Sequence, residues 1–223
     1  MPSLGRLHLI TDTRPGCDPL GVLRAALVAA RTADATADLV VQVRVEDDMS
    51  DRDAYELTVR AVTDCAAYQV SCLVNDRLHV ALATGAAGAH VGALDLPVDA
   101  ARRVLGPAAI LGATARDPAT GRAAVAAGAT YLGVGPCYAT GTKAGLPDPI
   151  GLAGLAAVAA AVDVPVVAIA GVTVERVPQL LAAGAHGVAV VGAVAAAADP
   201  GQATADLLAA VRRPASFADG APA

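Results

Sequence analysis

The feature that most constrains this fold is an alternation of short apolar runs with longer helix-like segments, repeated eight times along 223 residues. The apolar runs are nearly continuous, which is typical of strands covered on both faces, as in parallel sheets. The sequence predicts strands over 7–11, 39–45, 71–75, 89–92, 109–113, 130–135, 164–170 and 187–191. It predicts helices over 20–31, 53–68, 78–84, 98–105, 118–127, 151–161, 174–183 and 201–211.

Eight strand–helix units in a chain of this length favour one closed α/β domain, a (β/α)8 TIM barrel over residues 1–213. A doubly wound open sheet is the alternative, but the first strand, LHLITD, is followed by no glycine-rich dinucleotide fingerprint. The Ala-, Pro- and Gly-rich segment 214–223 is expected to be a disordered tail.

The joints between helices and strands carry a repeated signal. Ala-Gly-Ala occurs at 87–89, 127–129 and 183–185, each time between a predicted helix and a predicted strand. Glycine can adopt the left-handed conformation that ends a helix, so we expect it to do so here. Asp117 followed by Pro118 predicts an N-cap and the first helical position. Only 2% of residues are aromatic, so the core requires close approach of helices to strands.

Composition excludes several classes of protein. The net charge is −5 and no basic run exceeds two residues, so we expect no nucleic-acid partner. No uninterrupted apolar run approaches the roughly 20 residues of a membrane span, and the N-terminus does not resemble a signal segment. We therefore expect no membrane association and a cytoplasmic location. The cysteines lack metal-ligand spacing and are expected to be buried thiols: Cys17, Cys65, Cys72 and Cys137.

In a barrel of this kind the active site lies where the strands end, so the residues that follow each predicted strand form one ring. The ring offers carboxylates, amides, guanidinium groups, hydroxyls and an ammonium group. That inventory suits binding of an anion and a metal better than acyl transfer. The ring residues that we consider are Asp12, Gln42, Arg44, Asn75, Asp76, Arg77, Asp95, Thr114, Arg116, Lys143, Gly171, Val191 and Gly192.

Two carboxylates, Asp76 and Asp95, each follow an apolar run. If the two runs are neighbouring parallel strands, both carboxylates leave the sheet at the same end. Mg²⁺ takes oxygen ligands and keeps open positions for phosphate oxygens, so this pair is a candidate metal site. The alternative is that each Asp caps the helix that follows it.

Gln42 and Arg44 lie on one face of the second predicted strand. An inward-facing Arg44 needs a partner, which is either a bound phosphate or the carboxylate of Asp12 or Glu46. His8 and His90 lie in apolar strands, where we expect hydrogen-bonded core residues.

Two glycine-bearing turns are candidate anion sites. The segment Thr140-Gly141-Thr142-Lys143 combines hydroxyls, backbone N–H groups and the only lysine of the chain; a solvated turn is the alternative. Gly192 is expected to begin a short helix whose N–H groups face a phosphate.

Several segments have the order and spacing of one enzyme family: LHLITD (7–12), QVR (42–44), NDR (75–77), HVGALDLP (90–97), GVGP (133–136), TGTK (140–143), AIAG (168–171) and VAVV (188–191). On these segments the chain resembles the thiamine-phosphate synthase family from its first strand to about Val211. The resemblance implies a transferase of thiamine biosynthesis. It would join hydroxymethylpyrimidine diphosphate to hydroxyethylthiazole phosphate, releasing diphosphate and leaving thiamine phosphate.

The resemblance also implies roles for the ring residues. Asp76 and Asp95 would bind Mg²⁺, and Arg44 and Lys143 would be the catalytic cations. The partners would be small phosphorylated substrates, with a homo-oligomer possible. The diphosphate would contact Gln42, Arg44, Asn75 and Lys143, and Thr114 and Arg116 would be further substrate-binding residues. The thiazole phosphate would contact Thr140, Gly141, Thr142, Gly171, Val191 and Gly192.

The chain departs from the family pattern within this ring. Glu46 stands where the family usually has Lys, and Arg116, where it has His, is a candidate replacement for that lost charge. The remaining departures are Ala93 for Gln, Thr114 for Ser, Ala170 for Gly and Gly192 for Ser. A non-coupling paralogue that binds a phosphorylated thiazole or thiamine-like ligand is therefore the alternative function. A phosphosugar isomerase fits less well, because no carboxylate pair is identifiable as its acid and base.

Overall fold

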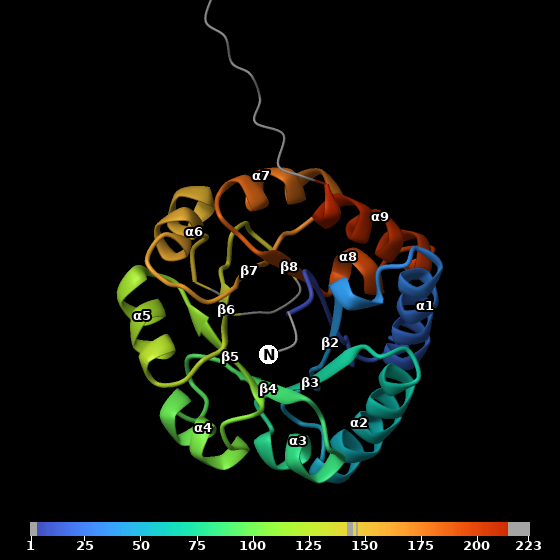
Figure 1. The fold of residues 1–223 in the computed structure, drawn as a ribbon. Helices are drawn as coiled ribbons and strands as arrows, with labels where there is room; N and C mark the ends of the chain where they lie inside the picture. Colours follow the sequence, from blue (N-terminus) through green and yellow to red (C-terminus); the bar gives the residue numbers. More distant parts are fainter. Residues whose placement is uncertain (1–3, 142–144, 146, 214–223) are drawn as a thin grey trace, which may run out of the picture.

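The computed structural model describes residues 4–141, 145 and 147–213. Within these ranges, eight parallel strands close into a barrel in sequence order and helices form the outer ring (Figure 1). The (β/α)8 prediction is confirmed. The open-sheet alternative is wrong, because the last strand pairs with the first through Leu7 and Val188. The expected tail at 214–223 lies outside the described residues.

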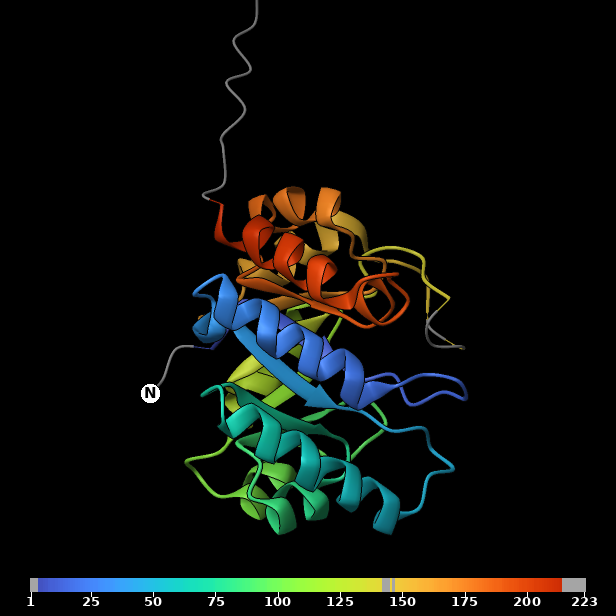
Figure 2. The same cartoon turned by 90° about the vertical axis from the view of Figure 1, so that its right-hand side faces the viewer.

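The strands agree with the predicted ranges to within two residues. They are β1 (Leu7–Ile10), β2 (Leu39–Val43), β3 (Ser71–Asn75), β4 (Gly88–Val91), β5 (Ile110–Ala115), β6 (Tyr131–Val134), β7 (Val166–Ile169) and β8 (Gly187–Val190). All eight adjacent pairs are parallel. Their carboxyl ends therefore meet on one face, where the loops after β1, β2 and β6 project away from the N-terminus (Figure 2).

The helices follow the predicted segments with one difference. They are α1 (Pro19–Thr32), α2 (Asp51–Ala66), α3 (Leu78–Thr84), α4 (Val98–Leu105), α5 (Pro118–Ala126), α6 (Gly151–Ala159), α7 (Val177–Ala182), α8 (Gly192–Ala195) and α9 (Pro200–Arg212). The helix predicted over 174–183 begins instead as a 3-10 turn, Val174–Arg176. Pro178 lies in the first turn of α7 and has no N–H, so it cannot donate to Val174 in an α-helical pattern.

Asp117 caps α5 as predicted. Its Oδ1 accepts hydrogen bonds from the N–H groups of Ala119 at 2.8 Å and Thr120 at 3.0 Å. The hydrogen bonds from Thr120 and Ala119 hold the pKa of Asp117 below its ordinary value. Helices α1 and α9 begin in the same way, with an Asp cap followed by proline.

The Ala-Gly-Ala prediction is correct at two of its three positions. Gly128 and Gly184 have φ of 106° and 94° and follow α5 and α7. Gly88 instead opens β4, where an added Cβ would lie 1.8 Å from the carbonyl oxygen of Ile110. Helix α3 ends at Gly85, with φ of 69°. The third glycine is therefore required by strand packing, and an earlier glycine ends the helix.

Three of the four cysteines, Cys65, Cys72 and Cys137, are buried as predicted, whereas Cys17 is exposed. It lies in the loop between β1 and α1. All four are free thiols. Among the described residues, no helix combines the length and hydropathy needed to cross a membrane.

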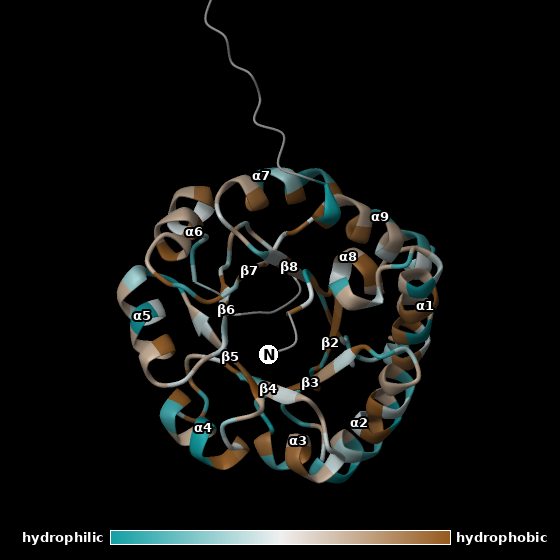
Figure 3. Ribbon diagram, viewed as in Figure 1, coloured by the Kyte–Doolittle hydropathy of each residue, from teal (hydrophilic) through white to brown (hydrophobic). Residues whose placement is uncertain are grey.

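Two apolar layers hold the barrel together. The larger lies between the helices and the strands, and in Figure 3 brown segments are frequent among strands and helices while teal is frequent on the outer ring. The smaller fills the barrel itself, and its buried members are Ile10, Val40, Leu73, Tyr131, Val167 and Ala189. The inner layer shares the barrel with polar side chains: His8 and Gln42 are 1% and 4% exposed.

Gly112 of β5 makes room for the ring of Tyr131. An added Cβ at Gly112 would lie 2.1 Å from Cζ of Tyr131 and 2.4 Å from Nδ1 of His90. We expect Gly112→Ala to destabilise the protein by about 1–3 kcal/mol, because the rings must shift within a packed barrel. The urea concentration at the unfolding midpoint measures this effect.

Gly201→Ala is the matched control. At Gly201 a Cβ would approach only Asp199 Oδ1 at 3.3 Å and Ala25 O at 3.7 Å, so its midpoint should stay close to wild type. Equal midpoints for Gly112→Ala and wild type would show that the two rings are not packed over Gly112.

Candidate active site at the carboxyl ends of the strands

Asp76 and Asp95 lie at the ends of neighbouring strands. Asn75, the last residue of β3, pairs in register with His90 of β4. The N–H of Asp76 then donates to the carbonyl oxygen of His90 at 2.8 Å, with the Asp76 backbone in the left-handed region at φ 62°. Asp95 Oδ2 accepts a hydrogen bond from the N–H of Gly92 at 2.6 Å. The backbone of Asp76 and the carboxylate of Asp95 are thus each held by a hydrogen bond next to β4.

The capping alternative for these two residues is wrong. The N-cap of α3 is Arg77 and that of α4 is Pro97, and neither makes a side-chain cap hydrogen bond. Both helices start one or two residues later than the alternative requires, so Asp76 and Asp95 do not occupy the N-cap.

These carboxylates fit a hard cation as its protein ligands. Within the described ranges, no group of three or more His, Cys, Asp or Glu side chains could hold a metal ion. Mg²⁺ is typically bound by one or two carboxylates, with water and substrate phosphate oxygens as its other ligands. Two carboxylates at adjacent strand ends, with Asn75 beside them, meet that requirement.

Arg44 is paired with a carboxylate of its own loop. Its backbone N–H donates to Thr11 Oγ1 at 2.9 Å, which fixes the chain just beyond β2. Its guanidinium donates from Nη1 to Glu46 Oε1, also at 2.9 Å. Glu46 is therefore the carboxylate partner that the sequence left open. Asp12 pairs instead with Arg14, whose Nε lies 2.8 Å from Asp12 Oδ1.

Arg77 anchors the loop between β2 and α2. It donates to the carbonyl oxygen of Met49 at 2.6 Å and forms an ion pair of 2.9 Å with Asp51. A weaker contact of 3.4 Å reaches the carbonyl oxygen of Glu46. Arg77 therefore holds Glu46, and with it Arg44, close to the end of β3.

Gln42 and Thr114 are connected by a chain of hydrogen bonds that passes through Tyr131 and His90. Gln42 Nε2 lies 3.3 Å from the Tyr131 hydroxyl, which lies 3.1 Å from Nδ1 of His90. Nε2 of His90 lies 3.0 Å from Thr114 Oγ1. Burial lowers the pKa of His90 to about 4, although Asp95 opposes the shift. His90 is thus the hydrogen-bonded residue that the sequence predicts, and the network itself was not foreseen.

His8 only partly fits its prediction. It is 1% exposed, and burial, helped by His90, lowers its pKa to about 3. Among the described residues its Nε2 has no hydrogen-bond partner. The ring packs 5.2 Å from that of Tyr131, so His8 is a core residue whose polar contacts are incomplete.

The loops after β5 and β6 supply further predicted residues. Arg116 Nη2 donates to the carbonyl oxygen of Asp148 at 2.7 Å, which ties the β5 end to the start of α6. Thr140 and Gly141 lie in the loop after β6, and Gly141 is exposed. Thr142 and Lys143 lie outside the described residues.

The loop after β7 is anchored by Arg176, a residue that the sequence reading missed. Arg176 Nη1 donates to the carbonyl oxygen of Gly171 at 2.6 Å, and its guanidinium stacks 4.3 Å from the ring centroid of Tyr138. Ala170 and Gly171 both have positive φ, of 76° and 65°. The sequence signal that could have identified Arg176 is its position at the start of a helical segment, five residues after Gly171.

The loop after β8 leads directly into the short helix that the sequence predicts. Val191 is the N-cap of α8 and Gly192 is its first residue. The carbonyl oxygen of Val191 accepts hydrogen bonds from the N–H groups of Val194 at 3.1 Å and Ala195 at 2.9 Å. The N–H groups at the start of α8 therefore lie at the carboxyl end of β8.

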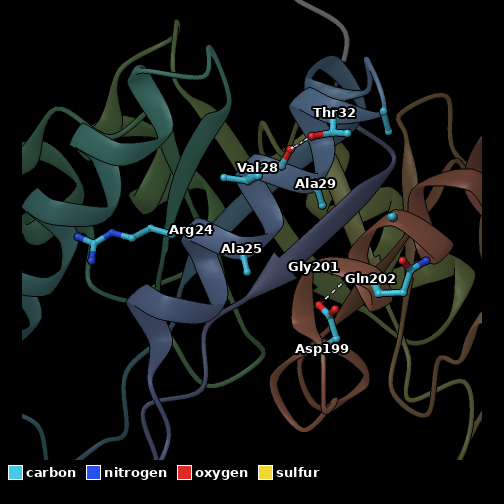
Figure 4. A pocket seen from close by; sticks show the side chains of 10 residues that line it. Arg24, Ala25, Val28, Ala29, Thr32, Asp199, Gly201 and Gln202 are labelled. Atoms are coloured by element: carbon cyan, nitrogen blue, oxygen red, sulfur yellow. Dashed lines mark hydrogen bonds between the residues drawn. The ribbon is translucent and has the colours of Figure 1, made fainter.

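A separate surface groove lies between α1 and α9 on the outer wall of the barrel (Figure 4). It is lined largely by small side chains, including Ala25, Ala29 and Gly201. Both helices lie outside the strands, so this groove is distinct from the ring of strand-end residues.

Comparisons with known proteins show which family the chain is similar to. A family model described as thiamine monophosphate synthase matches residues 7–194. A relative from Salinispora arenicola, named thiamine-phosphate synthase, is 66% identical over 205 residues, covering 92% of this chain and 96% of that protein. A thiamine-phosphate synthase from Salinibacter ruber is 41% identical over 209 residues, covering 94% and 89%.

Two solved structures are similar to this chain in fold. The thiamine phosphate pyrophosphorylase from Pyrococcus furiosus superposes with a TM-score of 0.81 at 32% identity, covering 92% of this chain and 95% of that one. A 3-hexulose-6-phosphate synthase, at a TM-score of 0.65 and 21% identity, shares the fold.

The Asp12–Arg14 pair predicts a dependence of stability on pH. The hydrogen bond from Arg14 holds the pKa of Asp12 below its ordinary value. Its stabilisation is therefore present above the unfolded-state pKa of about 4 and is lost as pH falls through the lower folded pKa. We expect Arg14→Met to lower the urea midpoint more at about pH 7 than at about pH 3.

Asp12→Asn supplies the control background. In it, Arg14→Met should have an effect on the urea midpoint that no longer changes with pH, because the titrating partner is absent. The same pH dependence in both backgrounds would contradict the pairing.

Proposed function

The chain belongs to the thiamine monophosphate synthase family, and we propose that it catalyses the coupling reaction of that family. It is a transferase that joins hydroxymethylpyrimidine diphosphate to hydroxyethylthiazole phosphate, giving thiamine phosphate and diphosphate. The observation that carries the function is the 66% identity to a thiamine-phosphate synthase over 92% of this chain. The substrates are small phosphorylated molecules, and homo-oligomerisation stays a prediction.

Asp76 and Asp95 are the proposed Mg²⁺ ligands. The position of both residues just beyond the neighbouring strands β3 and β4 supports this assignment, with the Asp76 backbone and the Asp95 carboxylate fixed by hydrogen bonds. Bound Mg²⁺ would supply neutralisation of the diphosphate charge, which makes diphosphate a better leaving group. Asn75 stands next to Asp76 and is proposed to hydrogen-bond the same diphosphate.

Arg44 and Lys143 are the proposed catalytic cations, with Gln42, Thr114 and Arg116 binding the same substrate. As the bond between diphosphate and the pyrimidine CH₂ breaks, negative charge grows on the departing oxygens. Fixed cations and N–H or O–H donors stabilise that charge. The pyrimidine ring disperses the positive charge on carbon, so this step needs little acid–base machinery.

Arg44 already has a carboxylate partner in the free protein. In the free protein its guanidinium is bonded to Glu46, with side-chain exposures of 16% and 32%. A diphosphate carries more charge than one carboxylate and can accept two parallel N–H bonds, so it competes for Arg44. Glu46 therefore lowers the affinity for diphosphate without removing the cation.

The thiazole phosphate is proposed to bind between the last three loops. Its ligands there are hydroxyls and backbone N–H groups, supported by the positive-φ turn after β7 and by the start of α8. The proposed contacts are Thr140, Gly141, Thr142, Gly171, Val191 and Gly192.

A non-coupling paralogue is the second candidate, and the Arg44–Glu46 pair is the observation that favours it. Such a protein would bind the thiazole phosphate and leave the diphosphate unbound. The two candidates differ in one measurable product, thiamine phosphate.

The first prediction for function uses purified protein, both substrates and Mg²⁺. We expect thiamine phosphate to form, and Asp76→Ala to lower kcat/KM by about 10²–10³-fold because charge stabilisation of the leaving group is lost. Asp99→Ala, which removes an exposed carboxylate on α4, should retain wild-type turnover.

The product decides between the two candidates. Absence of thiamine phosphate from the wild-type reaction, together with a rise in Tm on adding the thiazole phosphate, would replace coupling by the binding function. Equal turnover of wild type and Asp76→Ala would remove Asp76 from the metal site.

The second prediction concerns Glu46. Glu46→Gln frees Arg44 from its ion pair, so KM for the pyrimidine diphosphate should fall about two- to fivefold, as expected for a partly exposed pair. Glu56→Gln makes the same charge change at an exposed position of α2 and should leave KM unchanged. A higher KM for Glu46→Gln would mean that Glu46 itself helps to bind the substrate.

A further inference from the structure

Four side chains from four strands form one hydrogen-bonded chain across the barrel. Gln42 comes from β2, His90 from β4, Thr114 from β5 and Tyr131 from β6. The order of contacts is Gln42 to Tyr131 at 3.3 Å, Tyr131 to His90 at 3.1 Å and His90 to Thr114 at 3.0 Å. Both ends are residues that we propose to bind the diphosphate substrate. The two middle members, Tyr131 and His90, connect these ends.

The backbone makes room for this chain. An added Cβ at Gly112 would lie 2.4 Å from His90 Nδ1, and one at Gly133 would lie 2.9 Å from His90 Cε1. The two glycines lie on β5 and β6, the strands that carry Thr114 and Tyr131. The imidazole is thus confined, and its nitrogens face two hydroxyl groups.

With the Gln42 amide nitrogen facing Tyr131, the donors and acceptors of the chain assign the proton of His90 to one ring nitrogen. Tyr131 is 1% exposed, so its hydroxyl hydrogen needs an acceptor. Gln42 presents its amide nitrogen, a donor, to Tyr131. The acceptor must then be Nδ1 of His90, which therefore carries no proton. A neutral imidazole with an unprotonated Nδ1 carries its proton on Nε2, and Nε2 donates to Thr114 Oγ1.

With the same orientation of Gln42, a doubly protonated His90 would leave the Tyr131 hydroxyl hydrogen without an acceptor. With protons on both nitrogens, His90 would face the Tyr131 hydroxyl as a donor, and neither His90 nor the Gln42 amide nitrogen could accept the Tyr131 proton. A buried donor without an acceptor costs about 1–3 kcal/mol. The neutral ring with its proton on Nε2 satisfies all the members.

We propose that His90 is a positioning residue that makes the Thr114 hydroxyl a hydrogen-bond donor to the substrate. Because Thr114 Oγ1 accepts from His90, its own hydrogen is left for another acceptor, and a diphosphate oxygen offers acceptors only. Tyr131 acts one step further back, by keeping Nδ1 of His90 unprotonated. This inference rests on the proposed function, because that function makes Thr114 a substrate contact.

The reverse direction is the competing arrangement. Turning the Gln42 amide by 180° would let Tyr131 donate to Gln42, place the proton of His90 on Nδ1 and draw the Thr114 hydrogen onto Nε2. Thr114 would then present no donor to an anion. The two directions differ in which nitrogen of His90 is protonated, and that difference is measurable without substrate.

Nitrogen-15 NMR of protein labelled at histidine distinguishes the directions, because protonated and unprotonated ring nitrogens have widely separated chemical shifts. His90→Asn identifies the His90 signals by their disappearance. His186 is an internal reference, since its Nε2 lies 2.9 Å from the Leu4 carbonyl oxygen, which can only accept. We expect His90 to match His186 at Nε2 and to be unprotonated at Nδ1. Protonation of Nδ1 would overturn the proposal.

Paired substitutions test the role in binding. The amide of glutamine reaches the position of Nε2, whereas that of asparagine reaches only the position of Nδ1. His90→Gln should therefore keep the donor to Thr114 and hold KM for the pyrimidine diphosphate within about twofold of wild type. His90→Asn should raise that KM about ten- to a hundredfold, the loss expected for one hydrogen bond to a charged ligand. Equal rises in KM for both variants would overturn the proposal.

A double variant shows whether His90 acts through Thr114. If it does, His90→Asn added to Thr114→Val should raise KM no further than Thr114→Val alone. Additive effects would mean that His90 acts by another route. His79→Asn, at an exposed histidine of α3, is the control for the substitution itself.

Failure of this proposal and failure of the proposed function are separable. A wild-type protein that forms no thiamine phosphate would remove the function whatever the NMR shows. If the enzyme forms thiamine phosphate but Nδ1 of His90 is protonated, the proposed role of His90 is wrong and the proposed function stands.

Discussion

A phenol placed inside an aliphatic barrel must have its hydroxyl hydrogen-bonded, and much of this site depends on that requirement. Tyr131 is 1% exposed among Ile, Val, Leu and Ala side chains, where burial raises the pKa of its hydroxyl. An unsatisfied hydroxyl at that depth costs roughly 1–3 kcal/mol. Gln42 of β2 and His90 of β4 meet the requirement from across the barrel. The same contacts fix the two side chains at the base of the site.

The rim of the site is organised by ion pairs within and between loops. Arg14 binds Asp12, Arg44 binds Glu46, and Arg77 binds Asp51. Arg77 also holds the backbone of the loop that carries Glu46. The cations at this edge are therefore held in place before substrate arrives. Pre-positioned charge is the property that stabilises a departing diphosphate, because no reorganisation is needed when the charge develops.

Much of the fold could be predicted from the sequence, because strand and helix periodicity and capping are local signals. Asp117 before Pro118 was sufficient to place the start of α5. Local patterns failed where a distant backbone decides. Gly88 is required by the carbonyl of Ile110 on the adjacent strand, a contact that no helix-ending rule contains. Likewise Pro178 determined that a 3-10 turn precedes α7, although apolar spacing alone favoured one continuous helix.

The sequence predicts which residues lie at the carboxyl ends of the strands, but it does not predict which side chains there contact one another. Parallel strands guarantee that residues after each strand share a face, so Asp76 and Asp95 could be placed together. Which nitrogen of His90 meets which hydroxyl depends on the register of β4, β5 and β6, and register is set by three-dimensional packing. The Arg44–Glu46 pair shows the consequence. Glu46 departs from the family pattern by a reversal of charge, yet in the structure it orients the guanidinium of Arg44, which we propose to bind the diphosphate. A charge that looks unfavourable in the sequence therefore also serves to hold Arg44 at the mouth of the barrel until a stronger anion replaces it.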